Sequence, residues 1–336
     1  ATMSLKEEIL YNLECARRED RELSGEELAG KLGVSRMAVC KAVNTLREEG
    51  VEISSRRGGG YRMARQDLLS EGRVRAHLPG ECMGLKITVY GETDSTNKRA
   101  KLFAEEGNFT GEALFVADSQ TAGRGRLGRS FYSPASTGLY LSYLFSSEAP
   151  LQTLTAVTPY AAVSVAKILE RYTEKKILIK WVNDLYSEGR KVCGILTEAL
   201  TSLESGGDNR VVVGIGINVH QQPEDFAGEV ADIATSLDLS LDGRVCRAQL
   251  AVALLEEMDY LRREVLFAPE RWLADYRAAC LNVGRTVCLL RGDTRETVQA
   301  LRIDERYGLV VRHEDGTEET VRSGEVSVRG LYGYTE

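Results

Sequence analysis

The sequence predicts an α+β protein of three parts: an N-terminal winged helix-turn-helix, a central mixed or largely antiparallel sheet with helices, and a C-terminal SH3-like β-barrel. Three observations lead to this prediction. Short amphipathic helices come first, strands and helices then mix, and only short β-type segments follow from residue 282. We expect domains at 1–66, 82–281 and 282–336, with a linker at 67–81.

The composition is that of an ordinary globular protein, with 43% hydrophobic and 28% charged residues. A net charge of −7 argues against a protein that coats nucleic acid along its whole length. No apolar run reaches the ~18 residues of a membrane helix, and no signal segment is seen, so we expect a cytoplasmic protein without a membrane contact. Scattered cysteines without a Cys-x-x-Cys pair, and distant histidines, predict no metal site.

The first element is a helix over 5–18, where apolar residues recur at helical spacing. Ser24 is a typical N-cap for a second short helix, and Gly33 interrupts the pattern. Ser35 is a typical N-cap for a third helix that runs to about Gly50. Two short helices joined by Gly-Val-Ser form a helix-turn-helix.

A β-hairpin with a basic tip follows, from a short strand at 51–53 through the turn at 56–60 to Tyr61-Arg-Met. Residues 31–65 carry a local charge of +5, beside −4 in residues 1–30. A basic recognition helix with a basic wing favours DNA binding over the alternative, a small domain used for protein contacts. The residues expected to meet phosphates or base edges are Ser35, Arg36 and Lys41, and those expected at the backbone or minor groove are Arg56 and Arg57.

The central part begins with a strand at 86–90 that leads into a polar junction and a helix to about Gly107. On residue type alone, Ser95 or Thr96 is best explained as the N-cap of this helix. Together with Asn97, however, they present several small donors and acceptors at a strand-to-helix junction, where polar ligands often bind.

A loop that alternates glycine with arginine, Gln120-Thr-Ala-Gly-Arg-Gly-Arg-Leu-Gly-Arg129, lies between strands expected at 113–118 and 138–145. Glycine permits close approach of the backbone to a ligand. Guanidinium groups grip carboxylate or phosphate oxygens through forked hydrogen bonds. The loop therefore favours an anionic small molecule, and the alternative is a flexible surface linker.

A helix over 154–172 precedes three strand-like segments at 177–186, 191–198 and 210–219, and the first two of these form a hairpin. We expect a largely antiparallel sheet with the helices on one face. Polar residues fall at the strand ends: Lys180, Asn183, Asp184, Lys191 and Asn218. Each taken alone could be a surface residue, and Lys191 could be exposed after its turn. With the Gly-Arg loop they indicate one site for a ligand that carries a carboxylate and a phosphate.

These motifs, in this order, resemble those of a biotin–protein ligase: Thr93-Asp-Ser-Thr-Asn97, the Gly-Arg loop, Lys180-Trp-Val-Asn-Asp184, Lys191-Val-Cys-Gly194 and Gly214-Ile-Gly-Ile-Asn218. With the winged helix, the chain is similar to the bifunctional type that is also the biotin operon repressor. The resemblance covers essentially the whole chain, and it implies a class II synthetase-like ligase domain.

The resemblance implies that biotin and MgATP form biotinyl-5′-AMP, and that a lysine of a biotin carboxyl carrier protein then attacks it. It implies Lys191 and Arg126 as catalytic residues. The implied biotin-binding residues are Ser95, Thr96, Asn97, Gln120, Gly123, Arg124, Gly125, Arg126, Lys191, Gly194 and Gly214, with Gly216 as an alternative to Gly214. The implied residues for ATP and the adenylate are Arg126, Arg129, Lys180, Trp181, Asn183, Asp184 and Asn218.

The chain departs from the family's pattern in two apolar positions, Val182 for proline and Phe131 for tryptophan, and it lacks a tryptophan after Asn218 to stack on adenine. Mg²⁺ is expected to arrive on ATP with few protein ligands, and Asp184 is the carboxylate to test. The implied partners are operator DNA and a second copy of the chain on binding biotinyl-AMP. The alternatives are a ligase whose winged helix does not regulate transcription, and a ligand-sensing repressor without turnover. A lipoate ligase shares the fold, but the loop and winged helix favour biotin.

Overall fold

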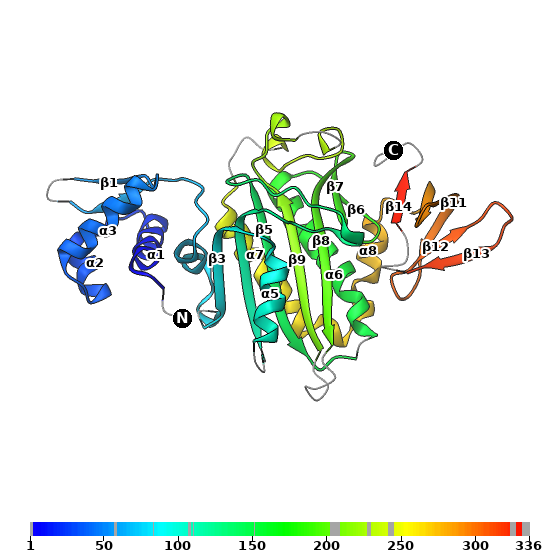
Figure 1. The fold of residues 1–336 in the computed structure, drawn as a ribbon, viewed down its shortest axis with the longest axis horizontal. Helices are drawn as coiled ribbons and strands as arrows, with labels where there is room; N and C mark the ends of the chain where they lie inside the picture. The colour runs from blue at the N-terminus through cyan, green and yellow to red at the C-terminus, as the bar shows by residue number, and fades with distance from the viewer. Residues whose placement is uncertain are drawn as a thin grey trace.

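A computed structural model describes residues 3–56, 59–82, 84–106, 109, 111–150, 152–201, 209–226, 230–240, 245–322 and 327–330. The N-terminal helices and the C-terminal strands lie on opposite sides of a large central sheet (Figure 1). No helix in these residues is long and apolar enough to cross a membrane.

The N-terminal part contains helices α1 (Leu5–Arg18), α2 (Gly25–Leu32) and α3 (Arg36–Glu48). The side-chain oxygens of Ser24 and Ser35 accept backbone N–H groups at 3.0 and 3.1 Å, as N-caps do. The predicted helix-turn-helix is therefore confirmed, with α3 as its second helix.

The wing consists of strands β1 (Ile53–Ser55) and β2 (Tyr61–Met63), which pair antiparallel. The strand expected at 51–53 begins later, because the N–H of Val51 bonds to the carbonyl of Leu46 in the turn that ends α3. Arg57, predicted to contact DNA, lies outside the described residues.

Helix α4 (Glu71–His77) lies within the segment for which we expected a linker. A Cβ on Gly72 would come within 2.1 Å of the carbonyl oxygen of Glu7, so α4 packs directly against α1. Seven residues are too few to show a helical apolar stripe in the sequence. This segment is therefore an ordered part of the fold.

The central part is a seven-stranded sheet in the order β3-β4-β5-β9-β8-β7-β6. β3 and β4 are parallel, and all other neighbours are antiparallel, which confirms the mixed sheet. Its strands are β3 (Lys86–Thr93), β4 (Glu112–Gln120), β5 (Gly138–Ser147), β6 (Ile177–Lys180), β7 (Asp184–Ser187), β8 (Arg190–Thr201) and β9 (Asn209–Asn218).

The single strand expected over 177–186 is wrong, because the chain turns back after Lys180 and pairs it with Asp184. Trp181 and Val182, joined by a cis peptide, form the turn and are 3% and 1% exposed. A turn built from buried apolar residues carries no glycine or polar signal, so the sequence reads as one continuous strand.

Helices cover both faces of the sheet, and the expectation of one covered face is wrong. α6 (Val157–Thr173) and α7 (Arg247–Arg263) share the large core with one face. On the other face, α5 (Thr96–Glu105) buries its alanines in a separate cluster with Phe115, Leu144 and Val212. The alternation of side chains along β4, β5 and β9 supplies both cores.

The C-terminal part is a five-stranded antiparallel sheet in the order β13-β12-β11-β10-β14. Helix α8 (Leu273–Ala279) precedes it, and a parallel bridge between Ile179 and Cys280 joins the edge of the central sheet to this connection. The strands are β10 (Thr286–Arg291), β11 (Thr294–Ile303), β12 (Leu309–Arg312), β13 (Glu318–Val321) and β14 (Ser327–Gly330). Short 3-10 helices are η1 (Gly80–Cys82), η2 (Arg126–Gly128), η3 (Thr153–Ala156), η4 (Pro223–Asp225), η6 (Asp238–Ser240), η7 (Val265–Phe267) and η8 (Pro269–Trp272).

Candidate functional site

A cavity of about 430 Å³ lies where the Gly-Arg loop, the start of α5 and the β6–β7 turn meet the ends of β8 and β9. Every residue predicted to bind the two small molecules lines it, except Gly123. The predicted residues in the lining are Ser95, Thr96, Asn97, Gln120, Arg124, Gly125, Arg126, Arg129, Lys180, Trp181, Asn183, Asp184, Lys191, Gly194, Gly214 and Asn218. Tertiary structure thus brings distant motifs to one site.

The Gly-Arg loop is folded into a tight hairpin that lines the cavity, which favours a binding loop over a flexible surface linker. The N–H of Gly125 donates to the carbonyl of Arg129 at 2.7 Å, and the N–H of Phe131 donates to that of Gly123 at 2.9 Å. A Cβ on Gly123 would lie 2.5 Å from the carbonyl oxygen of Phe131. Gly123 therefore permits the close pairing of the two sides of the loop.

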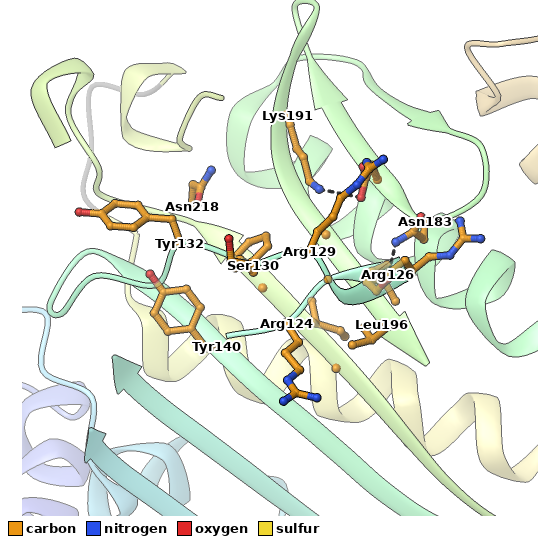
Figure 2. A pocket seen from close by; sticks show the side chains of 18 of the residues that line it. Arg124, Arg126, Arg129, Ser130, Tyr132, Tyr140, Asn183, Lys191, Leu196 and Asn218 are labelled. Carbon is orange, nitrogen blue, oxygen red and sulfur yellow. Dashed lines mark hydrogen bonds and ion pairs between the residues drawn. The ribbon is translucent and has the colours of Figure 1, made fainter. Parts of the chain in front are cut away.

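Arg126 is the least exposed of the three loop arginines that line the cavity. Its Nη1 donates to Oδ1 of Asn183 at 3.3 Å, and its Nη2 is buried without a hydrogen-bond partner in the described residues. Burial lowers the pKa of this guanidinium below its ordinary value. Figure 2 shows Arg126 turned toward Asn183, whereas Arg124 extends to the opposite side and is exposed. A buried N–H group without a hydrogen-bond partner costs free energy, so an anion bound beside Nη2 would be stabilised.

Lys191 lies near the start of β8 and lines the cavity (Figure 2). Its Nζ lies 2.8 Å from Oδ1 of Asp184 and 5.7 Å from the centre of the Phe131 ring. Only 27% of the Lys191 side chain is exposed, so it is not the freely solvated lysine that its place after a turn allowed. Backbone bonds between Lys191 and residues 233 and 235 hold this point of the strand.

A hydrogen-bonded polar cluster forms the opposite end of the cavity. The side-chain carbonyl of Gln120 accepts the N–H of Thr96 at 2.8 Å, and its amide donates to Ser133 at 3.0 Å. Ser142 lies within hydrogen-bond distance of Thr96, at 2.7 Å, and of Asn97, at 2.6 Å. These contacts hold the donors and acceptors of the cluster in fixed directions.

Ser95 occupies the N-cap position of α5, but its side chain makes no cap hydrogen bond. It is 5% exposed and lines the cavity. These observations support a ligand-binding role for Ser95 over a role as a helix cap alone.

The glycines of β8 and β9 make room for protein side chains. A Cβ on Gly214 would lie 2.1 Å from Oδ1 of Asn97, and one on Gly216 would lie 2.6 Å from the Phe131 ring. Gly194 has the same ring at 3.1 Å. The prediction that these glycines leave space thus has a direct physical basis, although the space is filled here by Asn97 and Phe131.

The residues predicted to bind the nucleotide make hydrogen bonds or ring contacts with other residues of the protein. The indole N–H of Trp181 donates to the carbonyl of Tyr307 at 3.0 Å, in the C-terminal part of the chain. Asn183 donates from Nδ2 to the carbonyl of Ile195 at 2.6 Å, and Asn218 donates to that of Thr235 at 3.0 Å. Lys180 is 4% exposed, with its ammonium 5.4 Å from the centre of the Tyr186 ring. These contacts orient the residues at the cavity wall.

Several lining residues were missed from the sequence, because their signals are weak. They are Leu127, Ser130, Tyr132, Tyr140, Leu141, Ile195, Leu196, Ile215, Phe226, Val230, Ile233 and Ala234. Two of them could have been predicted. Tyr132 is a half-exposed aromatic residue beside the loop, and Phe226 is the one Phe, Tyr or Trp between Asn218 and Arg247. The others, mostly apolar residues, carry no distinctive signal, and only folding brings them to the cavity.

Asp184 is the one carboxylate among the described residues that line the cavity. No group of three or more His, Cys, Asp or Glu side chains within the described ranges is arranged to hold a metal ion. A cation that enters this cavity would need most of its ligands from a substrate and from water.

The exposed face of α3 carries the residues predicted for DNA. Arg36 and Lys41 are exposed there, with Met37 81% exposed between them, and Arg56 is exposed at the wing. Ser35 is also exposed, but its oxygen already caps α3. Arg47 was missed: its guanidinium bonds to the Ile53 carbonyl at 2.8 Å, and it holds the wing against α3.

Comparison with known families matches residues 90–218 to the biotin/lipoate A/B protein ligase family and residues 9–62 to an HTH domain. The first match spans the polar cluster, the Gly-Arg loop, the β6–β7 turn and β9.

Curated relatives match over most of the chain. The bifunctional ligase/repressor BirA of Bacillus subtilis is 35% identical over 88% of this chain and 90% of its own length. The protein of the same name from Escherichia coli is 30% identical over 91% of this chain and 92% of its own length. Among solved structures, the biotin protein ligase of Aquifex aeolicus in complex with biotin and ATP is 31% identical, with a TM-score of 0.58, and covers 73% of this chain and 99% of its own.

Proposed function

Because this chain belongs to the biotin–protein ligase family, in the branch that carries an N-terminal HTH domain, we propose that its cavity joins biotin to ATP and that its HTH domain binds operator DNA. The protein is an ATP-dependent, AMP-forming biotin–[acetyl-CoA-carboxylase] ligase. The buried, unpartnered Nη2 of Arg126 in the cavity wall is the observation that best supports anionic substrates there.

In the first step, a carboxylate oxygen of biotin attacks the α-phosphorus of ATP and pyrophosphate leaves. Two anions must come together, so the barrier falls when fixed cations neutralise them. Arg126 and Lys191 both line the cavity and are available for this task, since Arg126 contacts Asn183 and Lys191 contacts the adjacent Asp184. Lys191 exchanges its partner Asp184 for the carboxylate, and Arg126 supplies its unpartnered nitrogen to the phosphate.

The bicyclic head of biotin fits the polar cluster at the other end. A ureido group has one acceptor and two donors, and Ser95, Thr96, Asn97 and Gln120 present both kinds of atom at buried positions in the lining. The backbone of the loop at Gly123, Arg124 and Gly125 covers the ligand. Gly194 and Gly214 let the Phe131 ring and the Asn97 amide lie close against the strands of the cavity floor.

The nucleotide fits the side of the β6–β7 turn. Asn183 and Asn218 would bond the adenine, and Arg126, Arg129 and Lys180 would meet the phosphates. Trp181 positions the turn through its contact with Tyr307. Mg²⁺ would enter on the phosphates of ATP and keep most of its waters, with Asp184 as the one nearby carboxylate in the described lining.

In the second step, the uncharged amine of a lysine on a biotin carboxyl carrier protein attacks the carbonyl carbon of biotinyl-AMP. AMP leaves with the electron pair of the broken bond, and the amine loses a proton. The exposed Leu127 and Tyr132 lie where the carrier would approach, because both line the mouth formed by the loop. The C-terminal sheet would form the SH3-like barrel beside this entrance.

Pyrophosphate exchange tests the enzymatic proposal. The full chain incubated with biotin, MgATP and labelled pyrophosphate should incorporate label into ATP only when biotin is present, and it should then attach biotin to a carrier domain. Lack of exchange would refute the ligase proposal. Exchange with lipoate in place of biotin would point to the related lipoate activity.

The repressor function rests on the HTH domain. Arg36, Lys41, Arg56 and Arg57 would contact DNA, with Ser35 at the start of the recognition helix. Biotinyl-AMP would act as the corepressor of a homodimer that pairs through the central sheet, where β3 has a single strand neighbour among the described strands. Binding to a palindromic operator only with biotinyl-AMP supports this, and binding to no DNA would indicate a ligase without a regulatory role.

The expected division of the chain into 1–66, 67–81, 82–281 and 282–336 remains part of this proposal, with the middle segment carrying α4. A cytoplasmic location remains a prediction.

A further inference from the structure

A buried cluster of charged residues joins three distant parts of the chain at the start of α7. Arg247 is 2% exposed, and its Nε and backbone N–H both donate to the carboxylate of Asp67, at 2.5 and 2.9 Å. Its Nη1 donates to Oδ1 of Asp118 in β4 at 2.7 Å. Asp67 lies between the wing and α4, so Arg247 ties the end of the HTH domain to the central sheet.

Asp67 has a second partner, which belongs to the segment after β9. Nε2 of His220 lies 3.0 Å from Oδ2 of Asp67, and Nδ1 of His220 lies 2.6 Å from Oδ2 of Asp238. The segment between His220 and Asp238 includes Phe226 and Ile233, which line the cavity. One carboxylate is therefore shared by the central sheet and by the segment that covers the site.

Both arms of the cluster reach residues at the cavity. Asp118 precedes Gln120 by two positions in β4, and Arg247 Nη1 also donates to the carbonyl of Gly138 at 2.8 Å. Gly138 pairs with Asn218 across the sheet. The backbone N–H of Asp238 donates to the carbonyl of Val219, directly after Asn218. A displacement of the biotin end or the nucleotide end of the cavity would thus act on Asp67.

The other side of Asp67 is held by α4, which is in turn bonded to α1 of the HTH domain. Nη1 of Arg73 donates to the carbonyls of Gln66 and Leu68, at 2.7 and 3.1 Å, on either side of Asp67. Nε of Arg73 donates to Glu14 of α1 at 3.2 Å, and the two side chains are 1% and 0% exposed. The position of Asp67 and the position of α1 are therefore mechanically linked.

Buried ion pairs are costly to separate, because each partner left alone keeps its desolvation penalty. Burial would raise the pKa of Asp67, but hydrogen bonds from His220 and Arg247 lower it to about 2, so the carboxylate is ionised. Three carboxylates share one guanidinium and one imidazole in this cluster. A shift of any one partner changes the best position of the others.

We propose that Asp67 is the positioning residue through which ligand binding in the cavity is transmitted to the HTH domain. The inference rests on the proposed ligase and repressor function. When biotin and ATP contact Phe226 and Ile233 at the cavity, the change reaches His220 and Asp238, and Asp67 carries it to Arg73, α4 and α1.

Amide hydrogen exchange of the full chain tests this, with biotin plus MgATP as the ligand. In the wild type, the ligand should change exchange in α1 and α4. In Asp67→Asn this change should disappear, while biotin-dependent pyrophosphate exchange continues. The matched control is Glu71→Gln, the same acid-to-amide change in the same segment, because Glu71 pairs with Arg75 inside α4. The control should keep the wild-type response.

A ligand-dependent change of wild-type size in Asp67→Asn would overturn the inference, as would no change in the wild type itself. If Asp67→Asn does not fold, Asp238→Asn decides, since it breaks the His220 arm and leaves Arg247 bound to Asp67: at least half of the response should be lost, and a full response overturns the inference. Absence of pyrophosphate exchange in the wild type would instead refute the ligase proposal.

DNA fragments selected from a random pool by the ligand-loaded wild type provide a second readout. For coupled sites, the ratio of the DNA dissociation constants without and with ligand is typically about 5–150-fold. In Asp67→Asn this ratio should fall toward 1. The effect of DNA on biotin affinity should decrease to the same extent. A preserved ratio contradicts the inference. If the wild type binds no DNA, only the repressor proposal fails, and hydrogen exchange still decides.

Discussion

The indole N–H of Trp181 donates to the backbone carbonyl of Tyr307 at 3.0 Å. This bond joins the β6–β7 turn, which lines the cavity, to the loop before β12 in the C-terminal sheet. The ring of Tyr307 packs edge-to-face on Tyr276, with ring centres 5.4 Å apart, and the Tyr276 hydroxyl donates to the carbonyl of Val182 at 3.1 Å. The C-terminal part thus stabilises the position of the β6–β7 turn.

Trp181→Phe should lower the free energy of unfolding, since it leaves the buried carbonyl of Tyr307 without its donor, at a cost of about 1–3 kcal/mol. Urea unfolding measures this. The matched control is Trp272→Phe, because the indole nitrogen of Trp272 has no hydrogen-bond partner in the described residues. An equal loss in the two variants would show that the bond to Tyr307 is unimportant.

Lys191→Gln should reduce the rate of biotin-dependent pyrophosphate exchange by ~10²–10³-fold, the usual effect of removing one charge-stabilising donor. The fold should survive, which circular dichroism would verify. Lys175→Gln is the control, because its ammonium pairs with Glu188 at 2.6 Å, at the β7–β8 turn of the same hairpin. Wild-type exchange in Lys191→Gln would remove this residue from the mechanism.

Gly214→Ala should raise the KM for biotin. The new Cβ would lie 2.1 Å from Oδ1 of Asn97 and would force this amide away from Glu198, which it bonds at 2.8 Å. A lost neutral hydrogen bond from Asn97 to biotin is worth about 0.5–1.5 kcal/mol, so the increase should be up to about tenfold. Gly91→Ala, with nothing within 4 Å of the new Cβ, should have no effect. An unchanged KM in Gly214→Ala would contradict the assignment of Asn97 to the biotin site.

Lys41→Ala should weaken DNA binding by a similar factor on every sequence, and it should lower the slope of log affinity against log salt by about 1, as expected for a phosphate contact. Fluorescence anisotropy at several salt concentrations measures both. The control is Lys6→Ala, which removes from α1 an ammonium group that pairs with Glu49 at the end of α3. A loss confined to one sequence would assign Lys41 to a base edge.

His220 should make the stability of the protein depend on pH. Burial would lower the pKa of this imidazole, but hydrogen bonds to Asp67 and Asp238 raise it above 6.5. Arg247, on the far side of Asp67, carries the other positive charge of the cluster. A raised folded pKa stabilises the fold fully below about pH 6.5, and this stabilisation is lost as pH rises through the folded value.

Thermal unfolding of the wild type and His220→Gln between pH 5.5 and 9 measures the effect. The wild type should be the more stable protein at low pH, and the difference should shrink as pH rises. A difference that is constant, or that grows with pH, would show that the imidazole is uncharged in the fold.

The local elements were predictable because their signals are local. Ser24 and Ser35 cap helices, the Gly-Arg loop lies between two strands, and the hairpin returns at Lys191, all within a few residues of the pattern that indicated them. The β6–β7 turn was missed, since Trp181 and Val182 are buried and carry no polar turn signal. α4 was missed because its seven residues are too few to show a periodic apolar stripe.

The sequence by itself determined which chemical groups are present and in what order: Gln120, the loop arginines, Lys191 and the glycines of β9. Only the tertiary structure decided which of them meet. It buried the Nη2 atom of Arg126 and left Arg124 exposed, and it paired Asp67 with Arg247, 180 positions along the chain. The physical reason is that helix and strand periodicity reports how one segment faces its core, whereas pairing of distant charges depends on how whole elements pack, which no local pattern contains.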